Sequence, residues 1–221
     1  MIAAARRHPI ALTCAVAVLA VALVAGCTRT VDSPLARPET VAAPISTLQV
    51  HDLLSPEVQD GEGNLFVSVD PDRCSGLARE VDPPFLATLR PMASAGGHWT
   101  TPDAAVYVEE MVAVYRYDFD SGAALENVRD TIQACRDTPL SVTTMRGRTY
   151  VFRAEPGAAE PPADSVLWSL RAADWNCDNA FVAAHNAAIE ITACGAAAGF
   201  DAAPLATDAR FRIEALANTT A

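Results

Sequence analysis

The sequence predicts an α+β domain in which a mainly antiparallel sheet carries packed helices and is fastened by two disulfides. Strand patterns outnumber helix patterns along the chain, and short turns join several of the strands, as in antiparallel sheets. One segment with helical periodicity ends at a cysteine. Four cysteines follow the N-terminal apolar segment, an even number that favours disulfides in an exported protein: Cys74, Cys135, Cys177 and Cys194.

Composition narrows the class of protein. The chain has 221 residues, of which 51% are apolar, and this content predicts a folded domain rather than a disordered chain. All 16 basic side chains are arginines, against 27 acidic ones, so the formal net charge is −11. Such a chain lacks the concentrated positive charge that displaces counterions from phosphates, and we expect no nucleic-acid partner.

The N-terminus has the pattern of a lipoprotein signal peptide. Two arginines precede a run of 16 residues, Ile10–Ala25, that is apolar except for one threonine. This run is shorter than the roughly 20 residues of a bilayer-spanning helix. Val24-Ala25-Gly26-Cys27 resembles the bacterial lipobox, so we predict cleavage after residue 26 and acylation of Cys27, with palmitate among the acyl chains. A plain secretory peptide and an uncleaved anchor are the alternatives.

Residues 27–46 are predicted to be the lipidated cysteine and a proline-rich tether, with prolines at positions 34, 38 and 44. A flexible tether of this length spans about 25 Å. The remaining residues, 47–221, suit one domain. The lipid would hold this domain at the outer face of the cell membrane, in the cell envelope.

The first half of the domain alternates short helices and strands. Leu48–Leu54 is predicted as a short helix, Asn64–Val69 as a strand and Pro71–Leu77 as a turn of helix. Val106–Tyr117 is the clearest strand, with valines on one face and tyrosines on the other. Glu109-Glu110 interrupts its apolar pattern and indicates a β-bulge or an open sheet edge.

A helix is predicted from a cap at Asp120 or Ser121 to Cys135. Its apolar positions share one helical face: Ala124, Val128, Thr131, Ile132 and Cys135. Two strands follow, Tyr150–Arg153 and Val166–Arg171, separated by a loop rich in proline, glycine and alanine. The last predicted helix spans Pro204–Leu216, with one apolar stripe: Leu205, Ala209, Ile213 and Leu216.

Between the last two cysteines lies a predicted hairpin. Two alternating segments flank His185-Asn186, and a two-residue turn there places Cys177 directly opposite Cys194. Their Cα atoms would be about 4.5 Å apart, which a disulfide accepts. By elimination, Cys74 pairs with Cys135. A four-cysteine metal site is the alternative, but no pair has the CxxC spacing that such sites use.

The hairpin register also assigns faces. Val182 opposite Ile189 and Ala180 opposite Ile191 form the expected core side. The opposite side carries the pairs Phe181 with Glu190 and Asn179 with Thr192.

The hairpin motif resembles a known family. Cys177-Asp178-Asn179-Ala180-Phe181, then Asn186, then the segment Ile189–Cys194, is similar to the pattern of the PknH-like extracellular sensor domains. Thr131-Ile132-Gln133-Ala134-Cys135 resembles the family's helix end, although tryptophan is frequent where Ile132 stands. Basic residues that are frequent in the family's hairpin are replaced here by Asn179 and Ala184. The resemblance covers about residues 45–217.

The resemblance implies an actinobacterial extracellular domain of sensor type with a groove for an envelope ligand. It also implies that the first cysteine pairs with the second and the third with the fourth. The two departures in the hairpin leave the ligand chemistry of the family unassigned to this chain.

Motifs of catalysis and metal binding are absent from the sequence. It contains no GxSxG, HExxH, P-loop or GxGxxG pattern, so we expect no enzyme, no metal and no cofactor. His185 is interpreted as a turn residue and His51 as a surface residue. His98, beside two glycines and Trp99, is interpreted as a loop residue, with a place in a groove as the alternative.

Aromatic residues are the candidate ligand contacts, because they line either a core or a cleft. We expect Tyr107, Tyr150 and Trp168 to line a groove, since their strands are predicted to be sheet neighbours. The favoured interpretation is a membrane-anchored envelope lipoprotein with a sensor-like, ligand-binding domain. A partner-binding or structural envelope module is the alternative, and an envelope hydrolase using His51 or His98 is a third.

Overall fold

A computed structural model describes residues 43–61, 63, 66–103, 105–157, 159–196 and 200–219. The predictions made for residues 1–42, including the signal peptide and the acylated Cys27, lie outside the described residues. Among the helices that are described, none combines the length and the apolar character that crossing a lipid bilayer requires.

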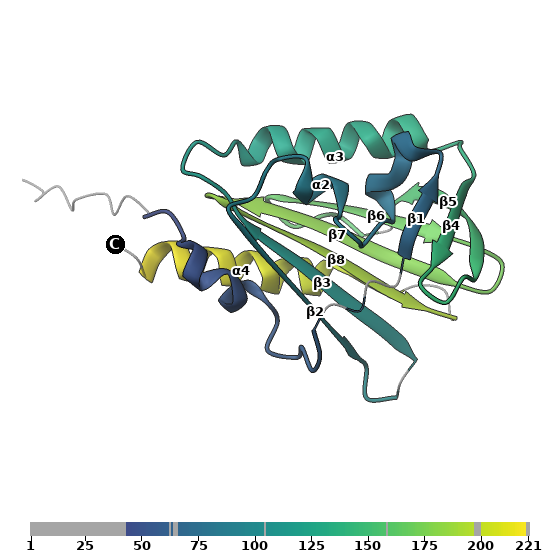
Figure 1. Cartoon of the computed structure of the whole chain (residues 1–221), viewed down its shortest axis with the longest axis horizontal. Helices are drawn as coiled ribbons and strands as arrows, with labels where there is room; N and C mark the ends of the chain where they lie inside the picture. The colour runs from purple at the N-terminus through teal and green to yellow at the C-terminus, as the bar shows by residue number, and fades with distance from the viewer. Residues whose placement is uncertain are drawn as a thin grey trace, which may run out of the picture. The chain divides into compact units, whose positions relative to one another are not determined.

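The described chain forms one antiparallel sheet of eight strands in the order β1-β4-β5-β6-β7-β8-β3-β2 (Figure 1). The strands are β1 Phe66–Asp70, β2 Ala93–Thr100, β3 Val106–Val114, β4 Leu140–Thr144, β5 Thr149–Pro156, β6 Ser165–Arg171, β7 Asn176–Ala184 and β8 Ala187–Gly195. The prediction of a mainly antiparallel sheet is confirmed, and the fold is dominated by the sheet more than the term α+β suggests.

Helices cover both faces of this sheet (Figure 1). The helical segments are η1 Thr47–Leu53, η2 Asp72–Leu77, α2 Pro84–Ala87, α3 Ser121–Cys135 and α4 Ala203–Thr219. One core lies between the sheet and α3 and includes Phe152, Trp168 and Phe181. A second core lies between the sheet and α4 and includes Ile189 and Ile213. The hairpin β7–β8 therefore buries both of its faces, not the single core side that alternation predicted.

Helix α3 follows its predicted periodicity. The Asp120 carboxylate caps it by accepting a hydrogen bond of 2.9 Å from the Ala123 amide. Ala124, Val128 and Ile132 are buried against the sheet, as predicted. The Cys74–Cys135 disulfide joins the end of this helix to η2.

The β7–β8 hairpin has the predicted register, with Cys177 bonded to Cys194 and a Cα–Cα distance of 4.1 Å. His185 takes a left-handed conformation in the turn, with φ of 50°. The side chain of Asn186 accepts a hydrogen bond from the Ile45 amide and donates to the carbonyls of Ile45 and Tyr115. The turn thus fixes Ile45, near the first described residue, to the interior strands β7 and β8.

Strand β3 corrects one prediction. Glu109 and Glu110 mark neither a bulge nor an edge, because β3 lies between β2 and β8 and pairs with both in continuous register. Both glutamates are buried. They are tolerated because each has a polar partner: Tyr107 for Glu109, and Arg212 for Glu110.

Other elements depart from the sequence pattern. Strand β2 escaped prediction because Gly96-Gly97 interrupts its alternation. A Cβ at Gly97 would lie 2.4 Å from the side chain of Val58, so glycine permits the close approach of the preceding segment. Strand β4 and the single turn α2 are also additional. In α4 two of the predicted stripe residues, Leu205 and Leu216, are only half-buried. The fully buried stripe consists mainly of small residues: Ala206, Ala209, Ile213 and Ala217.

Candidate functional site: an aromatic and arginine-lined pocket

A pocket of about 880 Å³ opens beside the β4–β5 hairpin, within the range of roughly 300–1,000 Å³ of small-molecule sites. Strands β2 and β3 supply one wall, and β5 with the β6–β7 turn supplies the other. The lining residues are Gly63, His98, Tyr107, Thr144, Met145, Arg146, Arg148, Tyr150 and Trp175.

Tyr107 and His98 form the first wall, with ring centroids 5.1 Å apart. The Tyr107 hydroxyl donates a hydrogen bond of 3.1 Å to the Glu109 carboxylate. Burial, reinforced by the negative charge of Glu109, raises the pKa of Tyr107 well above its ordinary value, so this hydroxyl keeps its proton. Gly63 crosses directly above it, because a Cβ at this position would fall 1.5 Å from the hydroxyl oxygen.

Tyr150 and Trp175 form the second wall, with stacked rings whose centroids are 6.2 Å apart. The Arg148 guanidinium lies 4.5 Å from the centre of the Tyr150 ring, in cation–π geometry. An ion pair with Asp174 holds Arg148 in this position. The indole N–H of Trp175 is buried without a hydrogen-bond partner in the described structure.

These contacts define the chemistry that the pocket suits. Aromatic rings on two walls bind flat apolar groups, and phenol and indole rings also stack on the faces of sugars. Arg146 and Arg148 place two guanidinium groups at the rim, of which Arg148 is already ion-paired with Asp174. Guanidinium groups favour carboxylates and phosphates. The pocket therefore suits a ligand with an apolar or sugar face and an anionic group.

Two of the three predicted contacts meet in this pocket. Tyr107 and Tyr150 both line it, although β3 and β5 are separated by three strands and are not the neighbours that we expected. Trp168 is not part of it. Its ring is buried edge-on against Phe85, and its N–H donates a 2.9 Å hydrogen bond to the Leu77 carbonyl.

The structure also places the three histidines of the domain and adds two pocket residues that were not selected from the sequence. His98 lies on strand β2 and lines the pocket. The alternative interpretation, a place in a groove, is therefore correct, and the interpretation as a loop residue is wrong. Arg148 and Trp175 escaped selection because each lies in or beside a turn, without periodic context. His51 is exposed on η1, and His185 lies 3.2 Å from Glu214 in the hairpin turn, so both have the surroundings that we predicted.

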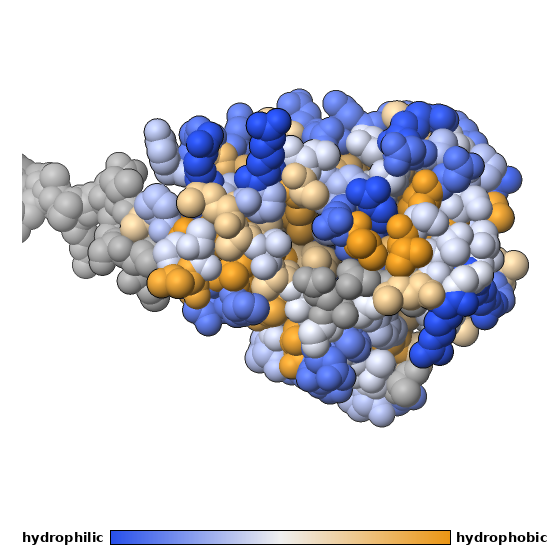
Figure 2. Space-filling model, in the orientation of Figure 1, coloured by the Kyte–Doolittle hydropathy of each residue, from blue (hydrophilic) through white to orange (hydrophobic). Residues whose placement is uncertain are grey.

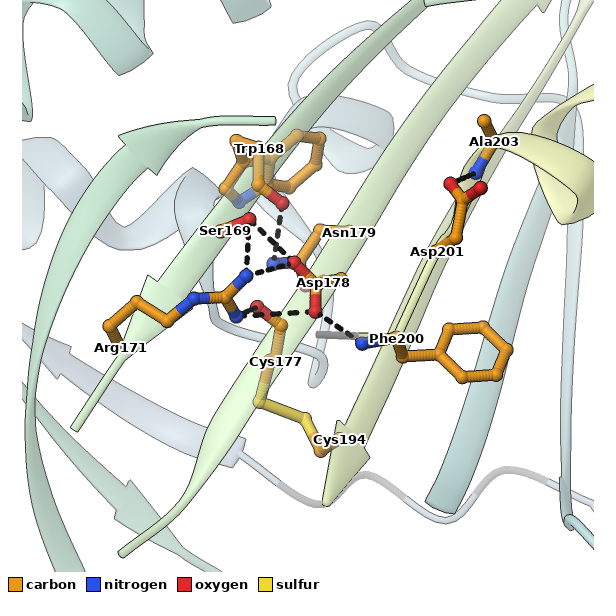
Figure 3. Close-up of polar contacts among 10 residues, drawn as sticks. All are labelled: Trp168, Ser169, Arg171, Cys177, Asp178, Asn179, Cys194, Phe200, Asp201 and Ala203. Carbon is orange, nitrogen blue, oxygen red and sulfur yellow. Dashed lines mark hydrogen bonds and ion pairs between the residues drawn. A yellow bond between two sulfur atoms is a disulfide. The ribbon is translucent and has the colours of Figure 1, made fainter. Parts of the chain in front are cut away.

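A second polar cluster lies on the α4 side (Figure 3). The Asp178 carboxylate accepts hydrogen bonds from the Ser169 hydroxyl at 2.5 Å, the Arg171 guanidinium at 2.5 Å and the Phe200 amide at 3.0 Å. It lines a smaller pocket of about 260 Å³. Because internal partners engage both carboxylate oxygens, we interpret the cluster as a structural lock between β6–β7 and the segment preceding α4. In the described part of the chain, no three His, Cys, Asp or Glu side chains are grouped to hold a metal ion.

Comparison with known proteins agrees with this architecture. Residues 41–210 match the family model of the PknH-like extracellular domain. The crystal structure of the extracellular domain of PknH from Mycobacterium tuberculosis resembles this fold with a TM-score of 0.61 and 18% sequence identity, over 80% of this chain and 99% of that one. At this identity the likeness is one of fold. No curated protein gives a match.

Proposed function

This chain belongs to the family of PknH-like extracellular domains, and we propose that it is a lipid-anchored envelope lipoprotein whose sensor-type domain binds a ligand in the Tyr107–Tyr150 pocket. The pocket is the observation on which ligand binding rests. The pattern Val24-Ala25-Gly26-Cys27 supports anchoring, with Cys27 as the acylated residue on the outer face of the cell membrane.

The ligand class follows from the walls of the pocket. A ring or a sugar face would lie between Tyr107 and Tyr150, and an anionic group would reach Arg148 or Arg146 at the rim. Glycans and lipid headgroups of the envelope carry both features. Because Asp174 already pairs with Arg148 beside the Tyr150 ring, an anionic group would engage Arg148 by sharing this guanidinium with Asp174 or by displacing the Asp174 carboxylate.

The experiment is native mass spectrometry of the full chain extracted from its own envelope. We expect a co-purified adduct with the wild type and its loss in Tyr150→Ala, because the stacking surface is removed. Val151→Ala is the matched control, since this neighbouring side chain is exposed and is not among the pocket-lining residues. Equal adducts in both variants, or an empty wild type that envelope glycans and lipids fail to stabilise thermally, would count against ligand binding.

Binding of a protein partner is the second candidate. Val151 on β5 is 61% exposed and lies outside the pocket, and Met145 at the pocket rim is 63% exposed. If this surface docks a partner, Val151→Asp weakens co-purification of that partner while Tyr150→Ala leaves it intact. Ligand binding should thus be sensitive to substitution at position 150 only, and partner binding to substitution at position 151 only.

Acylation has its own test. Metabolic labelling with a radioactive fatty acid is expected for the wild type and for Cys14→Ala, whose cysteine lies inside the signal peptide. Labelling should disappear in Cys27→Ala. Retained label in Cys27→Ala would remove the anchor from the proposal.

A further inference from the structure

Large apolar side chains are exposed at the end of the domain where the described chain begins. Leu48 is 92% exposed, Tyr117 84% and Met92 58%, and Leu89 is also exposed. Apolar residues gather over η1 and the adjoining part of α4 at this end of the space-filling view (Figure 2). Such side chains on a soluble surface mark an interaction site when they share one region.

Hydrogen bonds place three of these residues around one turn. The amide of Ile45, three residues before Leu48, and the amide of Tyr115, two residues before Tyr117, both bond to Asn186 in the β7–β8 turn. The Met92 amide bonds to the Val114 carbonyl at the adjacent end of β3. Leu48, Met92 and Tyr117, which we call the apolar end, therefore follow or precede backbone groups that meet at the same end of the sheet.

The ligand pocket lies at the other end of the same strands. Val114 pairs with Ala187 beside the turn, whereas Tyr107 pairs with Cys194 at the far end of β8. Val114 is seven residue steps along β3 from Tyr107, and at about 3.3 Å per step this is a distance of about 23 Å. One end of the sheet thus presents apolar side chains and the opposite end presents the pocket.

We propose that the apolar end docks on the lipid bilayer, with Leu48, Met92 and Tyr117 at the interface and the pocket directed away from the membrane. This inference rests on the proposed anchor at Cys27. Only 15 residues separate Cys27 from residue 43, so even a fully extended chain of about 3.3–3.6 Å per residue keeps the start of the domain within about 60 Å of the lipid.

The short connection favours docking on lipid over docking on a separate protein. Tethering makes contact with the bilayer an intramolecular event with an effective concentration in the millimolar range, so a few weakly inserting side chains suffice. Tyrosine is suited to the membrane–water interface. The net charge of the chain is −11, and Arg116 beside Tyr117 is paired with Asp118, so we take insertion of the apolar side chains, and not attraction to anionic headgroups, as the contact with lipid.

The test uses the acylated full chain in phosphatidylcholine vesicles with brominated acyl chains, which quench tryptophan by contact. Leu48→Trp and Tyr117→Trp introduce probes at the apolar end, and Met145→Trp is the matched control at the pocket end. Trp99, Trp168 and Trp175 give the same background in every variant. We expect the added fluorescence at positions 48 and 117 to fall at least twofold, with little change at position 145.

The outcomes separate docking from anchoring. Vesicle flotation without quenching at positions 48 and 117 would overturn the docking and leave the anchor in place. Failure of the chain to float with vesicles would contradict the proposed lipid anchor and, with it, the docking. A third outcome is that the probes become buried as the protein concentration rises but are not quenched by brominated lipid. This result would assign the apolar end to self-association and would also overturn the proposal.

Discussion

The two faces of the sheet each bury a glutamate, and they do so in different ways. On the α4 face, the Glu110 carboxylate receives hydrogen bonds of 2.7 Å from both Arg212 and the Ser55 amide. On the α3 face, Glu190 has an Oε2 atom that is buried without a hydrogen-bond partner in the described structure. The two residues lie on the adjacent strands β3 and β8.

The difference shows what allows a carboxyl group to remain inside a core. Burial raises the pKa of Glu110, but the positive charge of Arg212 and the Ser55 amide act in the opposite direction. Burial raises the pKa of Glu190 to about 8. Glu110 is thus accommodated as part of an ion pair, whereas Glu190 is accommodated by binding a proton at neutral pH.

The largest expected effect comes from breaking the ion pair. Arg212→Met leaves the buried carboxyl of Glu110 without its cation and should lower the free energy of unfolding by about 3–5 kcal/mol. Urea unfolding at pH 7 measures it. The double variant Arg212→Met with Glu110→Gln should recover most of the loss. Arg210→Met is the control, because its partners are partly exposed and surface pairs contribute about 0–1 kcal/mol. Equal losses at positions 210 and 212 would contradict the comparison.

A pH titration sharpens the other half of the comparison. Because the pKa of Glu190 is raised from 4.5 to about 8 in the folded state, folding binds a proton between these values. Its contribution to stability is complete below pH 4.5 and is lost as the pH rises to 8, by on the order of 3 kcal/mol between pH 5 and pH 8. Glu190→Gln should remove this part of the slope. Parallel pH profiles for the variant and the wild type would show that Glu190 is not protonated in the fold.

The smallest effect concerns Glu109, another buried glutamate, which accepts a hydrogen bond from the neutral phenol of Tyr107. Tyr107→Phe removes one hydrogen bond to this carboxylate and should cost about 1–2 kcal/mol of unfolding free energy. Tyr117→Phe, on an exposed ring, should cost almost nothing. Thermal or urea unfolding of both variants provides the measurement. An unchanged free energy of unfolding in Tyr107→Phe would show that this hydrogen bond does not stabilise the fold.

Local patterns predicted the parts of the fold that are local in sequence. The alternation around His185-Asn186 fixed the hairpin register and hence the Cys177–Cys194 pair, and the 3.6-residue period located α3. The partner of Glu110 lay beyond such patterns, because Arg212 is 102 residues away in a different element. Because no partner for Glu109-Glu110 is recognisable in the sequence, the two acidic residues by themselves indicate a β-bulge or an open sheet edge.

The pocket illustrates the same boundary between local and non-local information. Residue type alone selected Tyr107 and Tyr150 as candidates, and the structure places both on the pocket walls. It could not separate them from Trp168, since an aromatic side chain suits a core as well as a cleft. Only the position of β6 opposite α2 decides that Trp168 packs against Phe85.

The grip of Asn186 on Ile45 also has a mechanical consequence. The amide side chain holds both backbone groups of the residue at which the domain begins. Any pull along the preceding segment therefore reaches the turn joining the two strands β7 and β8 inside the sheet, and those strands are stapled together at their far end by a disulfide. Force applied there acts first on two interior strands, each paired along its length with a neighbour on both sides, and not on a strand at the edge of the sheet.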